Sequence, residues 1–190
     1  MSALPSWYPG SETKPAPMPL LLVQAFLNTR DLEDGADLLA GLPGGRAWLI
    51  DAGLLDEDAR LTEADLEVAR AVREDIRALL EAGDGSAAGG VLEPLRALTA
   101  DHHARLTLSD DGWLRLENAG HGELGDGLFE LLLIVHRAQQ DGSWTRLKLC
   151  GNPECRWAFF DRSRNQQGNW CSMAVCGNRL KNRELRARRR

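Results

Sequence analysis

The stretch CGNPECRWAFFDRSRNQQGNWCSMAVC, residues 150–176, contains every cysteine of this 190-residue chain. The cysteines form two close pairs, Cys150 with Cys155 and Cys171 with Cys176, and fifteen residues separate the pairs. Two such pairs joined by one loop are the pattern of a four-thiolate metal site, because each pair can turn both of its sulfurs toward one point. The Gly-Asn-Pro sequence inside the first pair favours the turn that this requires.

The metal that we expect in this site is one structural zinc ion. Zinc binds four thiolates in a tetrahedron, which leaves no open position for a substrate. Four thiolates also suit an iron–sulfur cluster or a single redox iron, and two disulfides would need an oxidising compartment. The sequence contains no second cluster motif and no secretory signal, so we expect zinc and a cytoplasmic location. Ser172 is expected to cap a short helix that begins after Cys171 and carries Cys176.

The charge of the chain is divided unevenly around this stretch. Residues 141–190 contain 12 of the 23 basic residues and four acidic ones, so this end carries +8 and residues 1–140 carry −13. A basic module on an acidic body favours binding to a polyanion. Beyond Cys176 the pattern predicts a helix with a basic stripe. We expect DNA contacts from six basic side chains, namely Arg162, Arg164, Arg179, Lys181, Arg183 and Arg186.

The spacing of apolar residues predicts a helical domain over residues 20–140. Apolar residues recur at helical spacing behind a capping box at Thr62 and Asp65 as far as Glu81, with Gly83 as the stop. Further helices are expected at residues 91–102 and 124–139, the latter buried at the centre. Leu20–Leu27 suits either a helix or a strand.

Two short alternating segments, residues 105–109 and 113–116, flank Asp110-Asp111-Gly112 and predict a β-hairpin. Residues 1–19 contain five of the eight prolines and predict a disordered leader. The expected fold class is therefore mainly α with a small β-hairpin (α+β). We expect three parts: a leader at residues 1–19, a helical domain at 20–140, and a zinc module at 141–190 that ends in a basic helix.

No apolar run is long enough to span a membrane, and no phosphate-binding loop or nucleophile motif is present. We therefore do not expect an enzyme. One polar site is a candidate in the helical domain, at Asn28, Thr29 and Arg30, where the first apolar run ends.

The nine residues CSMAVCGNR, 171–179, together with the first cysteine pair and FFDRSRN at 159–165, resemble the CGNR zinc finger. In its family this finger follows a helical domain called ABATE, and members are regarded as bacterial stress-induced transcription regulators. Residues 26–29 (FLNT) and 48–55 resemble signatures of that domain, so the resemblance covers about residues 20–190. It implies zinc on the four cysteines and DNA contact from Arg179, Lys181 and Arg183. Members usually carry arginine directly before Trp-Cys, where this chain has Gly168-Asn169.

The sequence thus favours a DNA-binding transcription regulator whose N-terminal domain dimerises or senses a signal. The expected partners are DNA and a second copy of the chain, and the effector is left unspecified. The alternative is a zinc-stabilised protein-interaction module that does not bind DNA directly. An enzyme built around Asn28, Thr29, Arg30 and a histidine is a third hypothesis that no catalytic motif supports.

Overall fold

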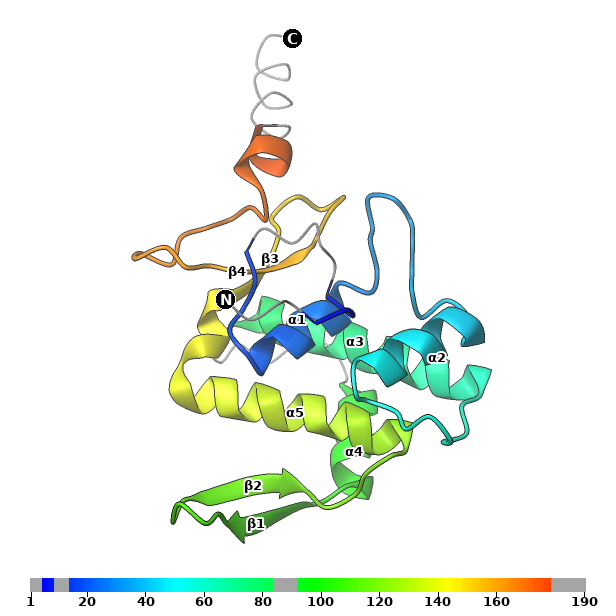
Figure 1. Ribbon diagram of the computed structural model, residues 1–190. Helices are drawn as coiled ribbons and strands as arrows, with labels where there is room; N and C mark the ends of the chain where they lie inside the picture. The colour runs from blue at the N-terminus through cyan, green and yellow to red at the C-terminus, as the bar shows by residue number, and fades with distance from the viewer. Residues whose placement is uncertain (1–4, 9–13, 84–91, 179–190) are drawn as a thin grey trace, which may run out of the picture.

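The computed structural model describes residues 5–8, 14–83 and 92–178 (Figure 1). Its elements in chain order are α1 (Leu20–Leu27), α2 (Leu42–Asp51), α3 (Glu63–Ala82), α4 (Glu93–Asp101), β1 (Ala104–Leu108), β2 (Leu114–Asn118), α5 (Leu124–Asp141), a 3-10 turn η1 (Ser143–Arg146), β3 (Leu147–Leu149), β4 (Ala158–Phe160) and a short π-type helix η2 (Met173–Gly177). The fold is mostly helical, as predicted. The expected basic helix after Cys176 lies outside the described residues.

Helix α3 begins and ends where the sequence predicts. Thr62 and Asp65 form a complete capping box, in which the Thr62 side chain accepts from Asp65 N and the Asp65 carboxylate accepts from Thr62 N. Gly83 ends the helix with a φ of 60°, a left-handed value that glycine adopts without strain. The buried face of α3 includes Leu66, Val72 and Ile76.

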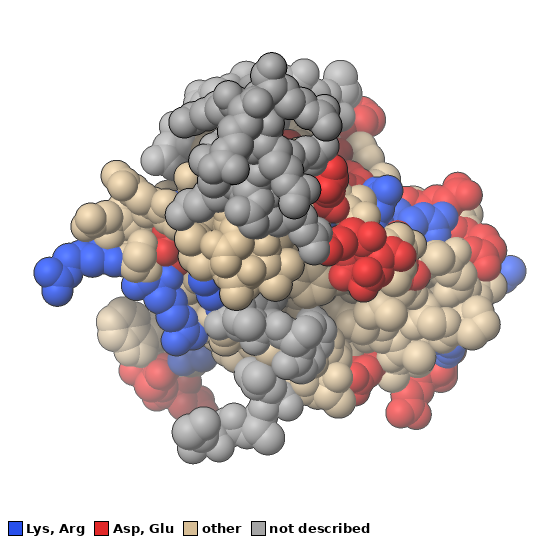
Figure 2. Space-filling view, turned by 90° about the horizontal axis from the view of Figure 1, so that it is seen from above, with Lys and Arg blue, Asp and Glu red and all other residues tan. Residues whose placement is uncertain are grey.

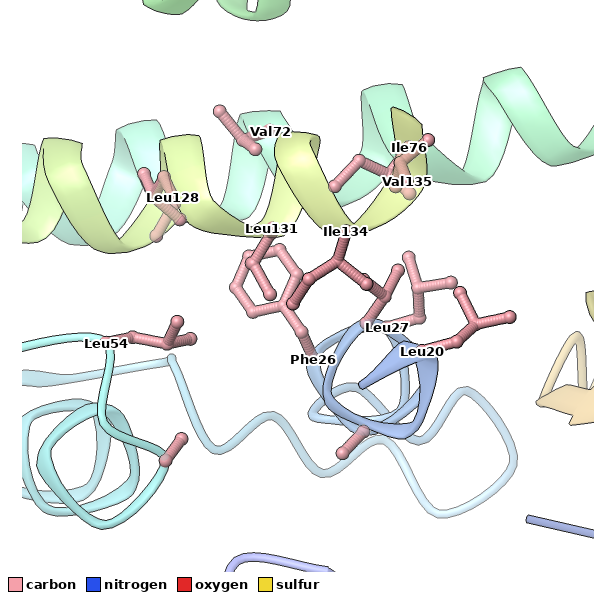
Figure 3. Close-up of a cluster of buried hydrophobic side chains, with 14 of the residues drawn as sticks. Leu20, Phe26, Leu27, Leu54, Val72, Ile76, Leu128, Leu131, Ile134 and Val135 are labelled. Atoms are coloured by element: carbon pink, nitrogen blue, oxygen red, sulfur yellow. The ribbon is translucent and has the colours of Figure 1, made fainter. Parts of the chain in front are cut away.

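Helix α5 is the central element of the helical body, which confirms the prediction. It contacts α1, α3 and α4 as well as β2. Figure 3 shows Leu131 and Ile134 of α5 facing Phe26 of α1 across the core. At Gly127 a Cβ atom would lie 2.0 Å from the carbonyl oxygen of Leu54, so only glycine allows this close approach. None of the described helices is long and apolar enough to cross a bilayer.

The described residues contain two antiparallel hairpins rather than the single one that the sequence predicted. Strands β1 and β2 form the expected hairpin, which lies beneath α5 at the lower end of the molecule in Figure 1. Strands β3 and β4 form the second one, with Leu147 opposite Phe160 and Leu149 opposite Ala158. Strand β4 was missed because three residues are too few for an alternating pattern to be recognised.

The N-terminal segment is ordered where the structure describes it. Tyr8 and Ala16 are buried. Ala16 N donates to the side chain of Gln24 at 2.7 Å, and the Lys14 carbonyl accepts from Phe160 N at 2.9 Å. The prediction of a disordered leader is therefore wrong for residues 5–8 and 14–19. Phe160 is far from this segment in the sequence, so the composition of the leader does not reveal the contact.

The hydrophobic core extends from the helical body into the second hairpin. Leu147, Ala158 and Phe160 belong to the same buried cluster as α1, α3 and α5. The cysteines form a second, separate cluster with Trp157 and Trp170. The β3–β4 hairpin therefore anchors the cysteine-bearing loops to the helical body.

Candidate metal centre

The first cysteine pair lies in the loop between β3 and β4. Cys150 follows β3 directly, and its N–H donates to the Trp157 carbonyl at 2.9 Å. The carbonyl of Asn152 accepts from both Cys155 N and Arg156 N at 3.0 Å, which closes the turn between the two cysteines. The Asn152 side chain accepts from Glu154 N and is almost completely buried.

The second pair is held by Ser172, as the sequence predicts. The Ser172 side chain accepts from Val175 N, and its carbonyl accepts from Cys176 N at 3.0 Å. Helix η2 then places Cys176 in its first turn. A backbone hydrogen bond of 2.8 Å from Gly151 N to the Asn169 carbonyl joins the loops of the two pairs.

The four sulfurs converge on one point. The Sγ atoms of Cys150, Cys155, Cys171 and Cys176 all lie within 4.8 Å of one another. Cys171 Sγ lies 3.7 Å from both Cys155 Sγ and Cys176 Sγ. A zinc–sulfur bond of about 2.3 Å in a regular tetrahedron sets the sulfur–sulfur distance at about 3.8 Å, whereas a disulfide needs about 2.05 Å. The cluster therefore fits one zinc ion and does not fit disulfides.

Three of the thiols strongly influence one another's pKa. Hydrogen bonds from Cys155 and Cys171 lower the pKa of Cys150, because they stabilise its thiolate. The same contacts with Cys150 raise the pKa of Cys155 and of Cys171. Four thiolates this close repel one another, and a divalent cation is the group that would allow all of them to ionise together.

Groups around the cluster complete the centre. Asn152 Nδ2 lies 3.9 Å from Cys176 Sγ and donates to it, which fixes the sulfur and offsets its negative charge. At Gly177 a Cβ atom would lie 2.8 Å from Met173 Sδ and 3.2 Å from the Trp170 ring. The glycine of the CGNR sequence thus packs closely against Trp170 beside the cluster, and a larger residue there would displace the flexible end of Met173.

The loop between the two cysteine pairs is organised by Asp161. Its buried carboxylate accepts from Ser163 N at 3.0 Å, Gly168 N at 2.7 Å and Lys148 Nζ at 3.2 Å. Burial would raise the pKa of Asp161, but these hydrogen bonds outweigh it and hold the pKa well below its usual range. A Cβ atom at Gly168 would lie 2.9 Å from the carboxylate carbon. The glycine at this position therefore fits the loop of this chain.

Two of the six predicted DNA-binding residues lie in this loop. Arg162 and Arg164 are exposed, and Arg162 donates to the Pro15 carbonyl at 2.8 Å. The other four, Arg179, Lys181, Arg183 and Arg186, lie outside the described residues. Seen from above, a group of Lys and Arg side chains lies on the left of the molecule, whereas most of the visible Asp and Glu lie on the right together with further Lys and Arg (Figure 2).

Comparison with known families places this geometry in context. Residues 146–189 match the CGNR zinc finger, and residues 21–139 match the ABATE model, described as "Putative stress-induced transcription regulator". The chain belongs to the ABATE family. It combines an ABATE domain with a CGNR zinc finger, as the sequence motifs indicate. A search among curated proteins finds no match to the chain.

The polar site predicted in the ABATE domain connects that domain to the zinc finger. Asn28 Nδ2 donates to the Ala158 carbonyl at 2.9 Å, and Asn28 Oδ1 accepts from Ala158 N at 2.8 Å. The side chain thus pairs with β4 as a strand would. Thr29 is buried beside it, whereas the Arg30 side chain is exposed and lies 3.4 Å from Glu74. The structure therefore brings Asn28 and Thr29 together but leaves Arg30 on the surface.

Two buried arginines of α3 extend this connection, and sequence reasoning missed both. Arg73 donates to Asp37 at 2.8 and 2.7 Å and to Thr29 Oγ1 at 2.8 Å. Arg77 donates to the Arg156 carbonyl in the first cysteine loop at 2.8 Å. Burial lowers the pKa of Arg77 to about 10, so its guanidinium stays charged at neutral pH. Their position on the apolar face of α3 was the signal in the sequence that could have indicated their burial.

Proposed function

We propose that this protein is a DNA-binding transcription regulator whose CGNR zinc finger makes the DNA contact. The observation that carries the proposal is the single four-cysteine cluster, because a zinc ion there would fix the loop that presents Arg162 and Arg164. A site with four protein ligands offers no catalytic position. The proposed ligands are Cys150, Cys155, Cys171 and Cys176, and the metal stabilises the loops.

The basic residues supply the second support. Residues 141–190 carry a net charge of +8 on a chain whose net charge is −5, so the zinc-finger end attracts polyanions. Arg162 and Arg164 of the loop are both exposed. Among the described residues, the Arg164 side chain has no hydrogen-bond partner, whereas the Arg162 guanidinium donates to the Pro15 carbonyl. We propose phosphate contacts from both, and from Arg179, Lys181, Arg183 and Arg186 beyond the described residues.

Binding of the zinc-loaded full chain to a labelled duplex, measured by fluorescence anisotropy over a range of salt, tests the proposal. We expect each phosphate contact to contribute about 0.9 to the slope of log affinity against log salt. Replacing Arg162 and Arg164 by alanine should weaken binding and reduce that slope by up to about 1.8. The matched control replaces the exposed Arg60 and Arg96 of the ABATE domain, which removes the same charge elsewhere. No binding at low salt, or equal losses in both variants, would refute the proposal.

A protein-interaction module is the second candidate, and one observation favours it. Met173 and Val175, which lie between the last two cysteines, are 49% and 47% exposed. Such apolar side chains beside a rigid metal centre suit a protein partner better than a phosphate backbone. Replacing Met173 and Val175 by serine should leave DNA affinity unchanged if the first proposal is right.

A further inference from the structure

The β1–β2 hairpin exposes an apolar face. The strand register places four leucines on one side of the sheet, namely Leu106, Leu108, Leu114 and Leu116. Their exposed fractions are 64%, 69%, 64% and 37%, and the adjacent Trp113 is 70% exposed. A groove of about 1100 Å³ separates the hairpin from the polar side of α5. Monomeric proteins rarely leave a contiguous patch of this kind in water.

The outer edge of β1 is also unpaired. The hydrogen bond from Ser109 N to the Trp113 carbonyl, at 2.9 Å, shows that odd-numbered residues of this strand bond to β2. Leu106 and Leu108 therefore direct their backbone N–H and C=O groups away from β2. Within the described part of the chain the sheet has two strands, and Figure 1 shows β1 as the outermost. A third strand could add to this edge without displacing any described segment.

The hairpin carries charges that are complementary to those of a second copy of the hairpin. Arg105 lies at its base and Asp110 at its tip, and both are exposed. Neither side chain forms an ion pair with another described residue. Antiparallel pairing of two β1 strands would set the Asp110–Asp111 turn of each beside Arg105 of the other. Arg105 is the single charged residue of β1, so no like charges would face each other.

We propose that two copies of this chain form a dimer by antiparallel pairing of their β1 strands. Leu106 of each copy pairs with Leu108 of the other, and Thr107 lies on the two-fold axis. In this register outward-facing residues pair with outward-facing residues, and Arg105 of one copy lies opposite Ser109 of the other, next to the Asp110 turn. The result is a four-stranded sheet in which the leucine rows of both copies join. A hairpin that is marginal alone gains the additional strands that stabilise a sheet.

Sedimentation of the zinc-loaded full chain over a range of concentrations tests the dimer without any DNA, so its outcome is independent of the proposed function. The unmodified chain should dimerise, and replacing Leu106 and Leu108 by lysine should weaken the dimer by about tenfold or more. Val68→Lys is the matched control, because Val68 is 49% exposed on α3, outside the hairpin. Arg105→Asp should weaken the dimer, and the double change Arg105→Asp with Asp110→Arg should restore part of it.

A cysteine crosslink tests the register. Two Thr107→Cys residues across the axis would have Cα atoms about 4.5 Å apart, within the range for a disulfide. Thr107→Cys should form a covalent dimer on mild oxidation, and Arg115→Cys on the inner strand should not. Circular dichroism confirms that each variant is folded. Three outcomes would overturn the proposal. The unmodified chain could remain monomeric at every concentration, or the lysine changes at Leu106 and Leu108 could leave the dimer as intact as Val68→Lys does. The third is equal crosslinking at positions 107 and 115. The first outcome would leave the leucine face to a different protein.

Discussion

Individual residues connect the two family modules of this chain. Asn28 uses both ends of its amide on one backbone unit of β4, and Gln24 Nε2 donates to the same Ala158 carbonyl at 3.1 Å. Buried amides with complete hydrogen bonding are specific, because a substitution leaves a polar backbone group without a partner. The position of the zinc finger on the body is therefore set by a few side chains of α1 and α3.

Asn28→Asp should loosen the zinc finger. The new carboxylate replaces the N–H donor that faces the Ala158 carbonyl, so we expect a loss of about 2–3 kcal/mol in the free energy of unfolding at neutral pH. Zinc should also pass to a competing chelator faster. Urea unfolding and zinc transfer to an indicator dye measure the two effects. Asn165→Asp, at an exposed position of the cysteine loop, is the control, and equal behaviour of the two variants would contradict this role for Asn28.

Asp37→Asn should destabilise the chain and change its response to acid. Burial would raise the pKa of Asp37, but its hydrogen bonds to Arg73 outweigh burial and lower the pKa. The carboxylate therefore stabilises the fold above its unfolded pKa of about 3.9, and this contribution is lost as the pH falls below that value. We expect a loss of about 3 kcal/mol at neutral pH, since buried Arg73 then keeps only the half-exposed Glu74 as an anionic partner.

Denaturant unfolding at neutral and acidic pH measures this change. The loss of stability between the two pH values should be smaller in Asp37→Asn than in the unmodified chain. Zinc release in acid affects both chains alike, so the difference between them isolates the carboxylate. Parallel acid responses would show that the Arg73 pair has no part in pH-dependent stability.

At the scale of elements, the sequence predicts the caps and turns that depend on neighbouring residues. The capping box at Thr62 and the turn between β1 and β2 follow from neighbouring residues, and so does the Ser172 cap before Cys176. The cysteine spacing predicts the cluster because four sulfurs at that spacing can bind one metal ion together. What could not be predicted depends on distant partners: the order of the N-terminal segment, strand β4, and the buried arginines of α3. Each is fixed by contacts between parts of the chain far apart in sequence.

Removal of zinc should affect the loops and spare the helices. The cysteines belong to a cluster separate from the main core, whereas β3 and β4 belong to that core. A chelator should therefore increase hydrogen exchange in residues 150–157 and 168–178 and leave α5 protected. Hydrogen exchange with mass spectrometry measures both regions, and the zinc-free variant Cys171→Ser should reproduce the pattern. Loss of protection across the whole chain at once would mean that zinc holds the entire fold.

At the scale of the whole molecule, one substitution should strengthen the DNA contact that we propose. Asn169 is exposed and directly precedes Trp170 in the loop of the second cysteine pair. Asn169→Arg should raise duplex affinity and steepen the salt dependence by about 0.9, since it adds one phosphate contact. Gly168→Arg is the contrasting variant, because a side chain there meets the Asp161 carboxylate. Anisotropy over a range of salt measures both, and an unchanged slope for Asn169→Arg would place the DNA contact elsewhere.

The arrangement of the molecule determines what a β1-paired dimer could bind. The β1–β2 hairpin and the zinc finger lie at opposite ends of the chain, with α5 between them (Figure 1). In a β1-paired dimer each copy therefore keeps its zinc finger far from the joined strands. Because the paired strands do not involve the zinc fingers, we expect both fingers to stay available and the dimer to hold two DNA segments. An immobilised duplex should capture a second, labelled duplex when the full chain is present. The Leu106→Lys, Leu108→Lys variant should still bind the first duplex but fail to capture the second, because a monomer has one zinc finger. Capture that persists in this variant, or a dimer that occupies one duplex alone, would contradict a dimer that holds two DNA segments.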